Sequence, residues 1–153
     1  MILVNKKNKQ LLNINIKELV LINEMSMTIG LVMLTIGNFL GGMWANESWG
    51  RYWGWDPKET WALISIMVYA FVIHMRLIPG LKSNFAFTVA SILSFGSIIM
   101  TYFGVNFYLA GLHSYAKDDQ EISFVFIGIT LIMVLLLSLL AYPKYKKYLK
   151  NNR

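Results

Sequence analysis

Residues 44–61 read WANESWGRYWGWDPKETW, and they lie between two apolar runs at about 25–45 and 60–78. A membrane-spanning helix needs about 20 mostly apolar residues, which both runs supply. We therefore expect the Trp-rich stretch to be a short loop that joins two spans at a membrane face. All 5 Trp of the chain lie in this stretch. Because Trp is seldom fully buried, such a density indicates a surface with a specific purpose.

The composition of the whole chain also indicates a membrane protein. Of the 153 residues, 56% are hydrophobic and 14% are charged, whereas a soluble domain has about 25% charged residues. Two further apolar runs, at about 85–105 and 122–142, are also long enough to span a bilayer. The predicted fold is therefore all-α, a polytopic membrane helix bundle of about four transmembrane helices. No cleavable signal peptide is expected, because no small-residue cleavage site follows the first apolar run. The absence of Cys excludes a disulfide, thiol chemistry and a CxxCH haem-attachment site within these residues.

The distribution of basic residues predicts the orientation of the spans. Most of the 14 Lys and Arg residues precede the first span, connect the second to the third, or follow the fourth. Basic residues mark the cytoplasmic side, so both termini are predicted inside and the Trp-rich stretch outside. The basic C-terminal residues are interpreted as a topology signal or a contact with lipid headgroups, and no nucleic-acid partner is expected. The predicted domains are a cytoplasmic or interfacial lead-in at 1–20, a transmembrane domain at 21–142 and a basic cytoplasmic tail at 143–153.

The residues of the Trp-rich stretch permit two interpretations. Trp and Tyr are common at membrane interfaces, so one interpretation of the stretch is an aromatic belt. Alternatively, Trp49 and Trp53 would share a face if residues 47–54 formed a short interfacial helix. Gly50 and Gly54 would then leave room beside the rings for a flat ligand. Both interpretations remain open at this point.

The end of the same stretch has the pattern of a helix start. Asp56 is the predicted N-cap, Pro57 the first helical residue, and Glu59 the partner that closes a capping box. This pattern is compatible with either interpretation of the Trp residues, because a well-capped helix can follow a belt or a ligand surface.

The chain has 2 His residues, and each has a functional and an ordinary interpretation. His74 lies about 22 Å along the second span from Glu59. An ionisable residue inside a membrane is by default interpreted as a functional site. The ordinary interpretation is a neutral His that is hydrogen-bonded to a neighbouring helix, or one that snorkels toward the inner interface beside Arg76. His113 is predicted in the outer segment 106–121, on the face of the Trp residues. It is either an exposed loop His or, beside a broad aromatic surface, an axial ligand of haem iron.

A longer pattern resembles a known family. The string WGRYWGWDPKETW resembles the tryptophan-rich signature of the CcsA/ResC and CcmC/CcmF haem-handling proteins of cytochrome c assembly, and the CcsA branch most closely. The similarity extends over about residues 18–116 and includes YAFVIHMR at 69–76 and GLHSY at 111–115. Its length, with both His residues in place, makes it more specific than a short motif.

The resemblance implies a function in cytochrome c maturation. Family members carry haem b to the outer face of the bacterial inner membrane, hold it between two His residues over the Trp-rich surface, and present it to the CxxCH motif of apocytochrome c. By position, His113 matches the outer axial ligand and His74 matches the transmembrane His of an inner haem site. The residues that match the haem-platform motif are Trp49, Gly50, Trp53, Trp55, Asp56, Pro57, Glu59 and Trp61. Arg51 or Lys58 is expected to pair with the haem propionates, since these are the basic residues near the motif.

The sequence departs from the family in the number of spans and His residues. Family members have a further outer His upstream of the motif and a further transmembrane His. This chain resembles the C-terminal portion of a larger CcsA-like protein, or of a fused CcsB–CcsA synthetase. The expected partners are the upstream CcsA part, a CcsB-like subunit, apocytochrome c and the lipid bilayer. The chain is expected to be part of a cytochrome c synthetase complex and inactive alone. The alternatives are a haem transporter or chaperone subunit, a structural membrane subunit, or an inactive remnant.

Overall fold

The computed structural model describes residues 15–109, 112 and 124–151, and all regular structure within these ranges is helical. Four helical segments there are long and apolar enough to cross a membrane. The predicted all-α bundle of about four spans is therefore confirmed. The elements in chain order are α2 (Ile16–Trp49), α3 (Pro57–His74), a 3-10 turn (Met75–Leu77), α4 (Asn84–Ile99), a π turn (Met100–Gly104), α5 (Val105–Tyr108) and α6 (Phe124–Asn151).

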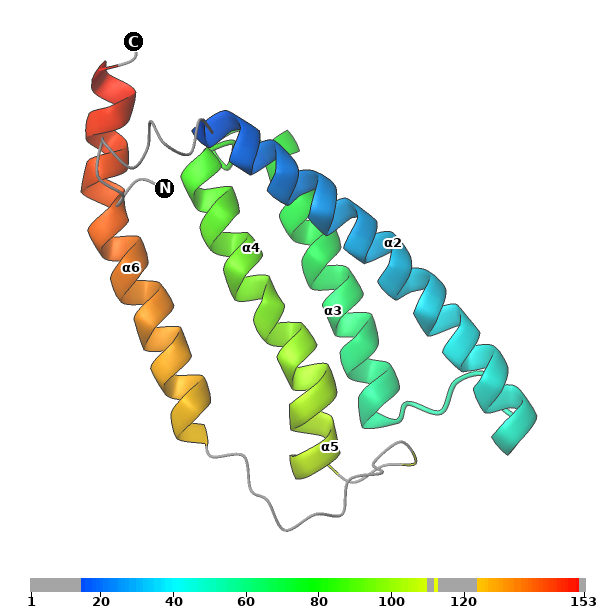
Figure 1. The fold of residues 1–153 in the computed structure, drawn as a ribbon. Coiled ribbons are helices and arrows are strands. Elements are labelled where there is room, and N and C mark those ends of the chain that lie inside the picture. Colours follow the sequence, from blue (N-terminus) through cyan, green and yellow to red (C-terminus); the bar gives the residue numbers. More distant parts are fainter. Residues whose placement is uncertain (1–14, 110–111, 113–123, 152–153) are drawn as a thin grey trace.

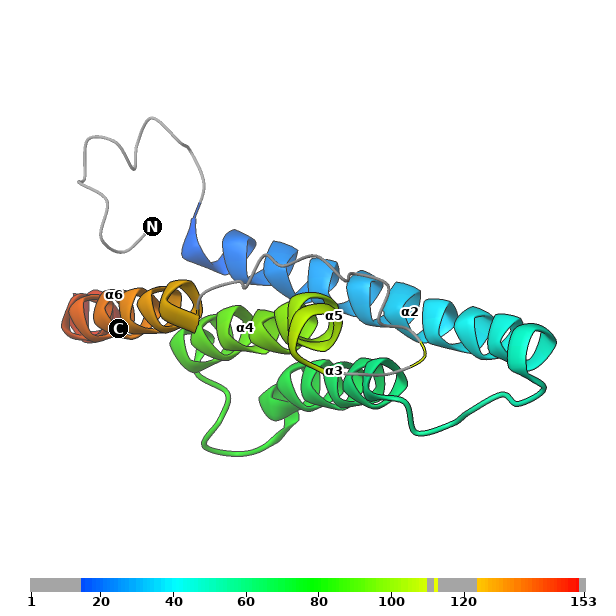
Figure 2. The same ribbon diagram turned by 90° about the horizontal axis from the view of Figure 1, so that it is seen from below.

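The long helices run alternately in opposite directions, so their ends gather at two ends of the bundle (Figure 1). We define the inner end as the end that contains the start of α2, the end of α3, the start of α4 and the end of α6. The outer end contains the end of α2, the start of α3, α5 and the start of α6. Helices α2, α3 and α4 pack against one another, whereas α6 packs against α4 (Figure 2). Among the residues that the structure describes, the basic residues predicted to be cytoplasmic lie at the inner end. They are Lys17, Arg76, Lys82, Lys144, Lys146, Lys147 and Lys150.

Two helices extend beyond the apolar runs that predicted them. Helix α2 begins after the N-cap Asn15, whose side chain accepts a hydrogen bond from the Glu18 amide while the Glu18 carboxylate accepts one from the Asn15 amide. Residues 16–20 of the predicted lead-in are therefore helical. Helix α6 continues through Pro143 to Asn151, so the predicted tail is helical through that residue. The domain boundaries themselves stay predictions.

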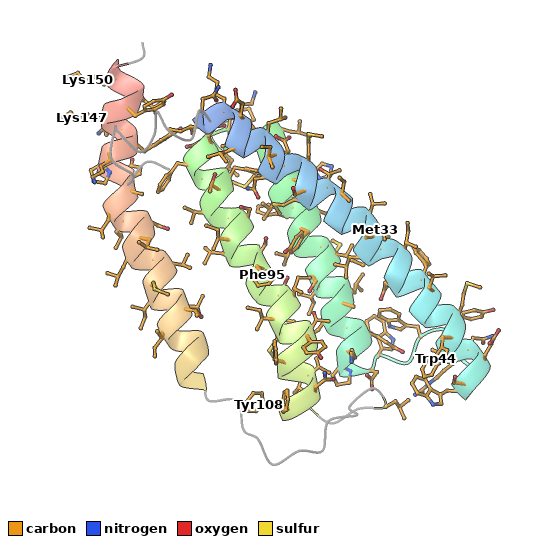
Figure 3. The ribbon with its side chains drawn as sticks, viewed as in Figure 1. Met33, Trp44, Phe95, Tyr108, Lys147 and Lys150 are labelled. Carbon is orange, nitrogen blue, oxygen red and sulfur yellow. The ribbon has the colours of Figure 1, made fainter. Side chains whose placement is uncertain are left out.

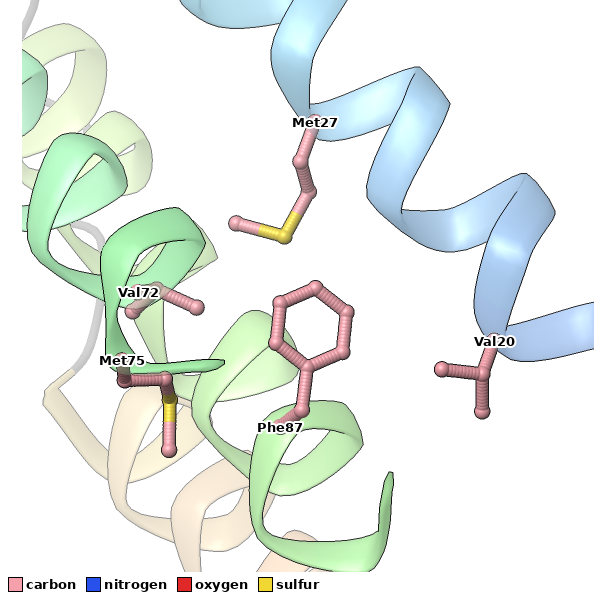
Figure 4. Packing of buried hydrophobic residues seen from close by; sticks show 5 residues of the cluster. All are labelled: Val20, Met27, Val72, Met75 and Phe87. Carbon is pink, nitrogen blue, oxygen red and sulfur yellow. The ribbon is translucent and has the colours of Figure 1, made fainter. Parts of the chain in front are cut away.

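The buried apolar core, whose packing Figure 4 shows, consists of residues near the inner end. It consists of side chains from α2, α3, the 3-10 turn and α4, namely Val20, Met27, Val72, Met75 and Phe87. The guanidinium of Arg76 lies 5.2 Å from the ring centre of the fully buried Phe87. Arg76 also pairs with Glu24 of α2 and donates to Asn84 of α4 at 3.2 Å. Apolar and polar contacts thus join the same three helices at this end.

Small polar side chains connect the helices further along the bundle. Ser65 of α3 is fully buried and lies 2.9 Å from the hydroxyl of Thr101 in the π turn. Thr101 also donates to the Trp61 carbonyl at 3.1 Å. Such residues permit close approach of membrane helices and supply hydrogen bonds between them. They fix the position of α3 relative to the segment that leads into α5.

Large apolar side chains cover the faces that point away from the bundle (Figure 3). Met33 and Phe95 are examples, and both are more than half exposed. In water such a surface would be unfavourable, whereas a hydrocarbon environment covers it without cost. The exposed faces therefore fit the membrane location that the composition predicted.

Candidate functional site

The Trp-rich stretch begins on helix α2 and leaves it at Gly50. This residue has φ +71°, and its amide donates to the Asn46 carbonyl at 2.8 Å. A left-handed residue at this position ends a helix, and Gly adopts it without steric penalty. The short helix that we considered at 47–54 is therefore wrong, because the helix stops at Trp49. Trp49 and Trp53 consequently do not share a helix face.

Four of the Trp rings form two edge-to-face pairs. The ring centres of Trp44 and Trp49, both on α2, are 5.1 Å apart with an angle of 82° between the planes. Trp53 and Trp55, both in the connection to α3, are 5.9 Å apart at 89°. This is a favoured geometry for aromatic pairs. Trp61 lies separately, in α3. Trp44 was absent from the predicted site residues, although its membership of the same Trp-rich stretch was a signal for including it.

Trp55 combines a strained backbone with an exposed ring. Its φ of +57° makes it the one non-Gly residue with positive φ among the described residues. A bulky side chain in this region costs about 1–2 kcal/mol. Its side chain is also 74% exposed. Strained backbone that persists in a structure often marks a functional position.

A single carboxylate oxygen holds the backbone on both sides of Trp55. Oε2 of Glu59 accepts the amide of Gly54 at 2.8 Å and the amide of Asp56 at 3.2 Å. The second bond is half of the predicted capping box, which is confirmed together with Asp56 as N-cap and Pro57 in the first turn. The helix start therefore also determines the conformation in which Trp55 is presented.

Arg51 fills the space beside Gly54 that we expected to be open. A Cβ added at Gly54 would lie 2.7 Å from Cζ of Arg51, so the guanidinium contacts this Gly directly. The backbone carbonyl of Tyr52 would lie 3.2 Å from a Cβ at Gly42 of α2. The connection thus folds back against α2, and both Arg51 and Tyr52 are exposed.

Lys58, the other basic residue near the motif, has a different environment. Its Nζ donates to Oδ1 of Asn106 in α5 at 3.2 Å. It also lines a cavity of about 390 Å³ between α2 and α3, together with Gly37 and Gly41. Of the two cations, Arg51 is the exposed one, and its guanidinium lies against Gly54, between Trp53 and Trp55 in the sequence.

Asp56 connects the Trp-rich stretch to the outer segment that follows α5. Its side chain is 7% exposed. Oδ2 accepts the Lys58 amide at 3.2 Å, and Oδ1 accepts the amide of Leu112 at 2.6 Å. The structure therefore places residue 112 next to the start of α3, on the same end as the Trp rings. His113 itself lies outside the described residues.

His74 lies at the opposite end of the bundle. It is the last residue of α3, which has 18 residues and is therefore about 27 Å long. The side chain is exposed, and Nδ1 lies 2.7 Å from the Ala70 carbonyl in the same helix. His74 therefore makes a hydrogen bond within α3, and not the predicted alternative of a bond to a neighbouring helix. The structure does not bring His74 together with the Trp rings, in agreement with the separate inner position that its place in the sequence predicted.

Comparison with known proteins identifies the family. Residues 2–113 match the family described as "Cytochrome C assembly protein". Protein NrfI of Wolinella succinogenes is 53% identical over 137 residues, which cover 90% of this chain and 15% of that protein. The cytochrome c biogenesis protein CcsA of Cuscuta reflexa is 49% identical over 102 residues (67% of this chain, 33% of that protein), and CcsA of Cyanophora paradoxa is 51% identical over 88 residues (58% and 27%). The chain thus spans a third or less of the length of these relatives. The resemblance to the CcsA branch is confirmed, and the chain belongs to the cytochrome c assembly protein family.

Proposed function

We propose that the chain takes part in cytochrome c biogenesis by holding haem b at the outer end of the bundle and presenting it to the CxxCH motif of apocytochrome c. The observation that supports this most is Trp55, an exposed ring on a strained backbone that Glu59 holds from both sides. An aromatic belt needs no strained residue, because interfacial Trp residues occur on ordinary helix ends. A fixed ring is what a flat apolar ligand requires.

The surroundings of Trp55 suit the chemistry of haem. Trp53 contacts it edge to face, so the pair offers ring surface in more than one plane. Arg51, an exposed residue whose guanidinium lies against Gly54, is the candidate partner for a propionate, with which Arg forms bidentate hydrogen bonds. In this arrangement His113 ligates the iron from one side. Its support is that the preceding residue, Leu112, is bonded to Asp56 at the Trp-rich stretch. The second axial ligand comes from sequence outside this chain, in the upstream CcsA part or a CcsB-like subunit.

His74 is proposed as a ligand in a separate inner haem site. When Nδ1–H donates to the Ala70 carbonyl, Nε2 holds the lone pair that can bind iron. Because the side chain is exposed on the surface of α3, a partner ligand has to come from a helix beside this chain. Haem in this scheme is cargo that moves from the inner to the outer end. The basic residues at the inner end support an orientation with that end in the cytoplasm of a bacterial inner membrane.

The test is haem titration of the chain in lipid nanodiscs together with its CcsA and CcsB-like partners. Replacing Trp53 and Trp55 together with Leu should weaken haem binding about tenfold or more, since aromatic contacts contribute about 0.5–1.5 kcal/mol each. The matched control is Phe95→Leu, because Phe95 is an exposed aromatic residue on α4. If the double variant and the control both bind haem like the wild type, the Trp residues are an interfacial belt and the proposal is wrong.

A second measurement separates a synthetase from a haem transporter or chaperone. The chain is reconstituted with its CcsA and CcsB-like partners, haem and an apocytochrome. Formation of a thioether-linked cytochrome that depends on Trp55 supports the synthetase assignment. Haem transfer without a thioether product indicates a chaperone subunit.

A further inference from the structure

A hydrogen bond joins two segments of the outer end that are far apart in the sequence. Oδ1 of Asp56 accepts the backbone amide of Leu112 at 2.6 Å, across 56 residues. A hydrogen bond to an ionised carboxylate is stronger than one between neutral groups. Leu112 directly precedes His113 in the sequence. The bond therefore ties the residue next to the proposed iron ligand to the N-cap of α3.

Asp56 is better placed to position other groups than to contact a ligand. It is 7% exposed, and both of its carboxylate oxygens accept backbone amides, from Leu112 and from Lys58. Its carboxylate thus presents little surface to haem. This arrangement differs from that of Trp55, the next residue in the chain, which is 74% exposed.

The first turn of α3 is a common anchor for both parts of the proposed site. Glu59 holds the amides on either side of Trp55, and Asp56 holds Leu112. Lys58 of the same turn donates to Asn106 in α5 at 3.2 Å, which adds a second connection to the outer segment. One rigid element thus determines where the ring and residue 112 lie relative to each other.

We propose that Asp56 is a positioning residue, whose carboxylate holds Leu112, the residue before His113, at the same helix start that holds Trp55. This inference rests on the proposed haem function. An aspartate suits the role because it offers two acceptor oxygens on a short side chain. Asn offers one acceptor, and Ser caps a helix as well as Asp does but is too short to bond a second segment. Asp56→Ser therefore removes the connection and keeps the helix cap.

The first experiment is hydrogen exchange of the haem-free chain in nanodiscs, with the amide of Leu112 as the probe. In Asp56→Ser this amide should exchange about tenfold faster or more, while the amides of the second turn of α3 keep their protection. The matched control is Glu47→Ser, which removes an exposed carboxylate at the same end of the bundle. The control should leave the exchange of Leu112 unchanged.

The second experiment adds haem to the same proteins after reconstitution with the CcsA and CcsB-like partners. Asp56→Ser should weaken haem binding about tenfold and change the Soret band, because the iron loses a uniformly placed ligand. Asp56→Asn should have an intermediate effect, and Glu47→Ser none. The inference is overturned if Leu112 exchanges at the wild-type rate in Asp56→Ser. It is also overturned if the exchange accelerates while haem affinity and spectrum stay the same. A wild-type complex with the CcsA and CcsB-like partners that binds no haem overturns the proposed function instead, and the exchange result then decides separately whether Asp56 holds Leu112.

Discussion

Trp55 is the residue at which the local rules of protein structure and the observed geometry disagree most. Its left-handed backbone favours Gly or Asn. The conformation persists in Trp55 because the flanking amides bond to Glu59. The neighbouring Gly50 shows the opposite case, since it occupies a left-handed position that suits it. The contrast supports the proposed role of Trp55 in binding.

Trp55→Asn tests this distinction. Asn tolerates the left-handed region better than Trp, so the variant should keep or gain up to about 1 kcal/mol of stability. Haem affinity should fall, because the exposed ring is lost. Thermal unfolding in detergent and haem titration measure the two quantities. Tyr52→Asn is the control at an exposed residue without positive φ, and it should not be stabilised. A loss of more than about 1 kcal/mol in Trp55→Asn means that the ring has a structural role.

At the scale of the element, the first turn of α3 organises the outer end. Its N-cap, its capping-box partner and its Lys each bond a different segment. A capping box ordinarily satisfies the free amides of a helix start. Here the same side chains also bond the connection from α2 and Leu112, which follows α5. The helix start therefore couples the local structure of α3 to the geometry of the candidate site.

Glu59→Ala should weaken both the helix start and the connection to α2. The variant loses two hydrogen bonds to backbone amides, which predicts destabilisation of about 1–2 kcal/mol. Glu59→Gln retains an acceptor for the capping box and should lose less than half as much. Glu47→Ala, at an exposed position of α2, is the control and should change stability by less than about 0.5 kcal/mol. Equal stability of Glu59→Ala and Glu47→Ala would contradict the role of Glu59.

At the scale of the whole molecule, the number of spans follows from the apolar runs, and their predicted orientation follows from the basic residues. The sequence predicted the spans because a bilayer requires long apolar segments whatever their detailed packing. It also predicted the start of α3, because the Asp-Pro-Lys-Glu pattern acts within one turn. Helix ends were predicted less well. Helix α2 begins nine residues earlier than its apolar run at about residue 25, since the polar residues of its first turns are helix-compatible and well capped.

The details of the candidate site had no comparable signal in the sequence. The left-handed backbone of Trp55 depends on Glu59, and the space beside Gly54 depends on where the Arg51 side chain lies. The bond between Asp56 and Leu112 links residues that are far apart in the chain. Such contacts depend on how the helices pack, whereas the sequence pattern reports only local and periodic preferences. The family resemblance indicated which residues matter, and the structure indicates how they are held.

The orientation in the membrane is testable because the chain has no Cys. Tyr52→Cys should react in spheroplasts with a membrane-impermeant maleimide added outside. Lys82→Cys, at the inner end, should react only after permeabilisation. Both positions are exposed, so a difference in labelling reports the side of the membrane and not burial. The parent chain without Cys is the background control. External labelling of Lys82→Cys in sealed spheroplasts would reverse the predicted orientation.

The most direct test of haem binding at the outer end is the absorption spectrum of the protein purified with its CcsA and CcsB-like partners. We expect the wild type to show His-ligated haem, and His113→Ala to lose the part of this spectrum that belongs to the outer end together with the yield of cytochrome c. Added imidazole should restore the spectrum of the variant by replacing the missing ligand. An unchanged haem spectrum and an unchanged cytochrome c yield in His113→Ala would contradict the account.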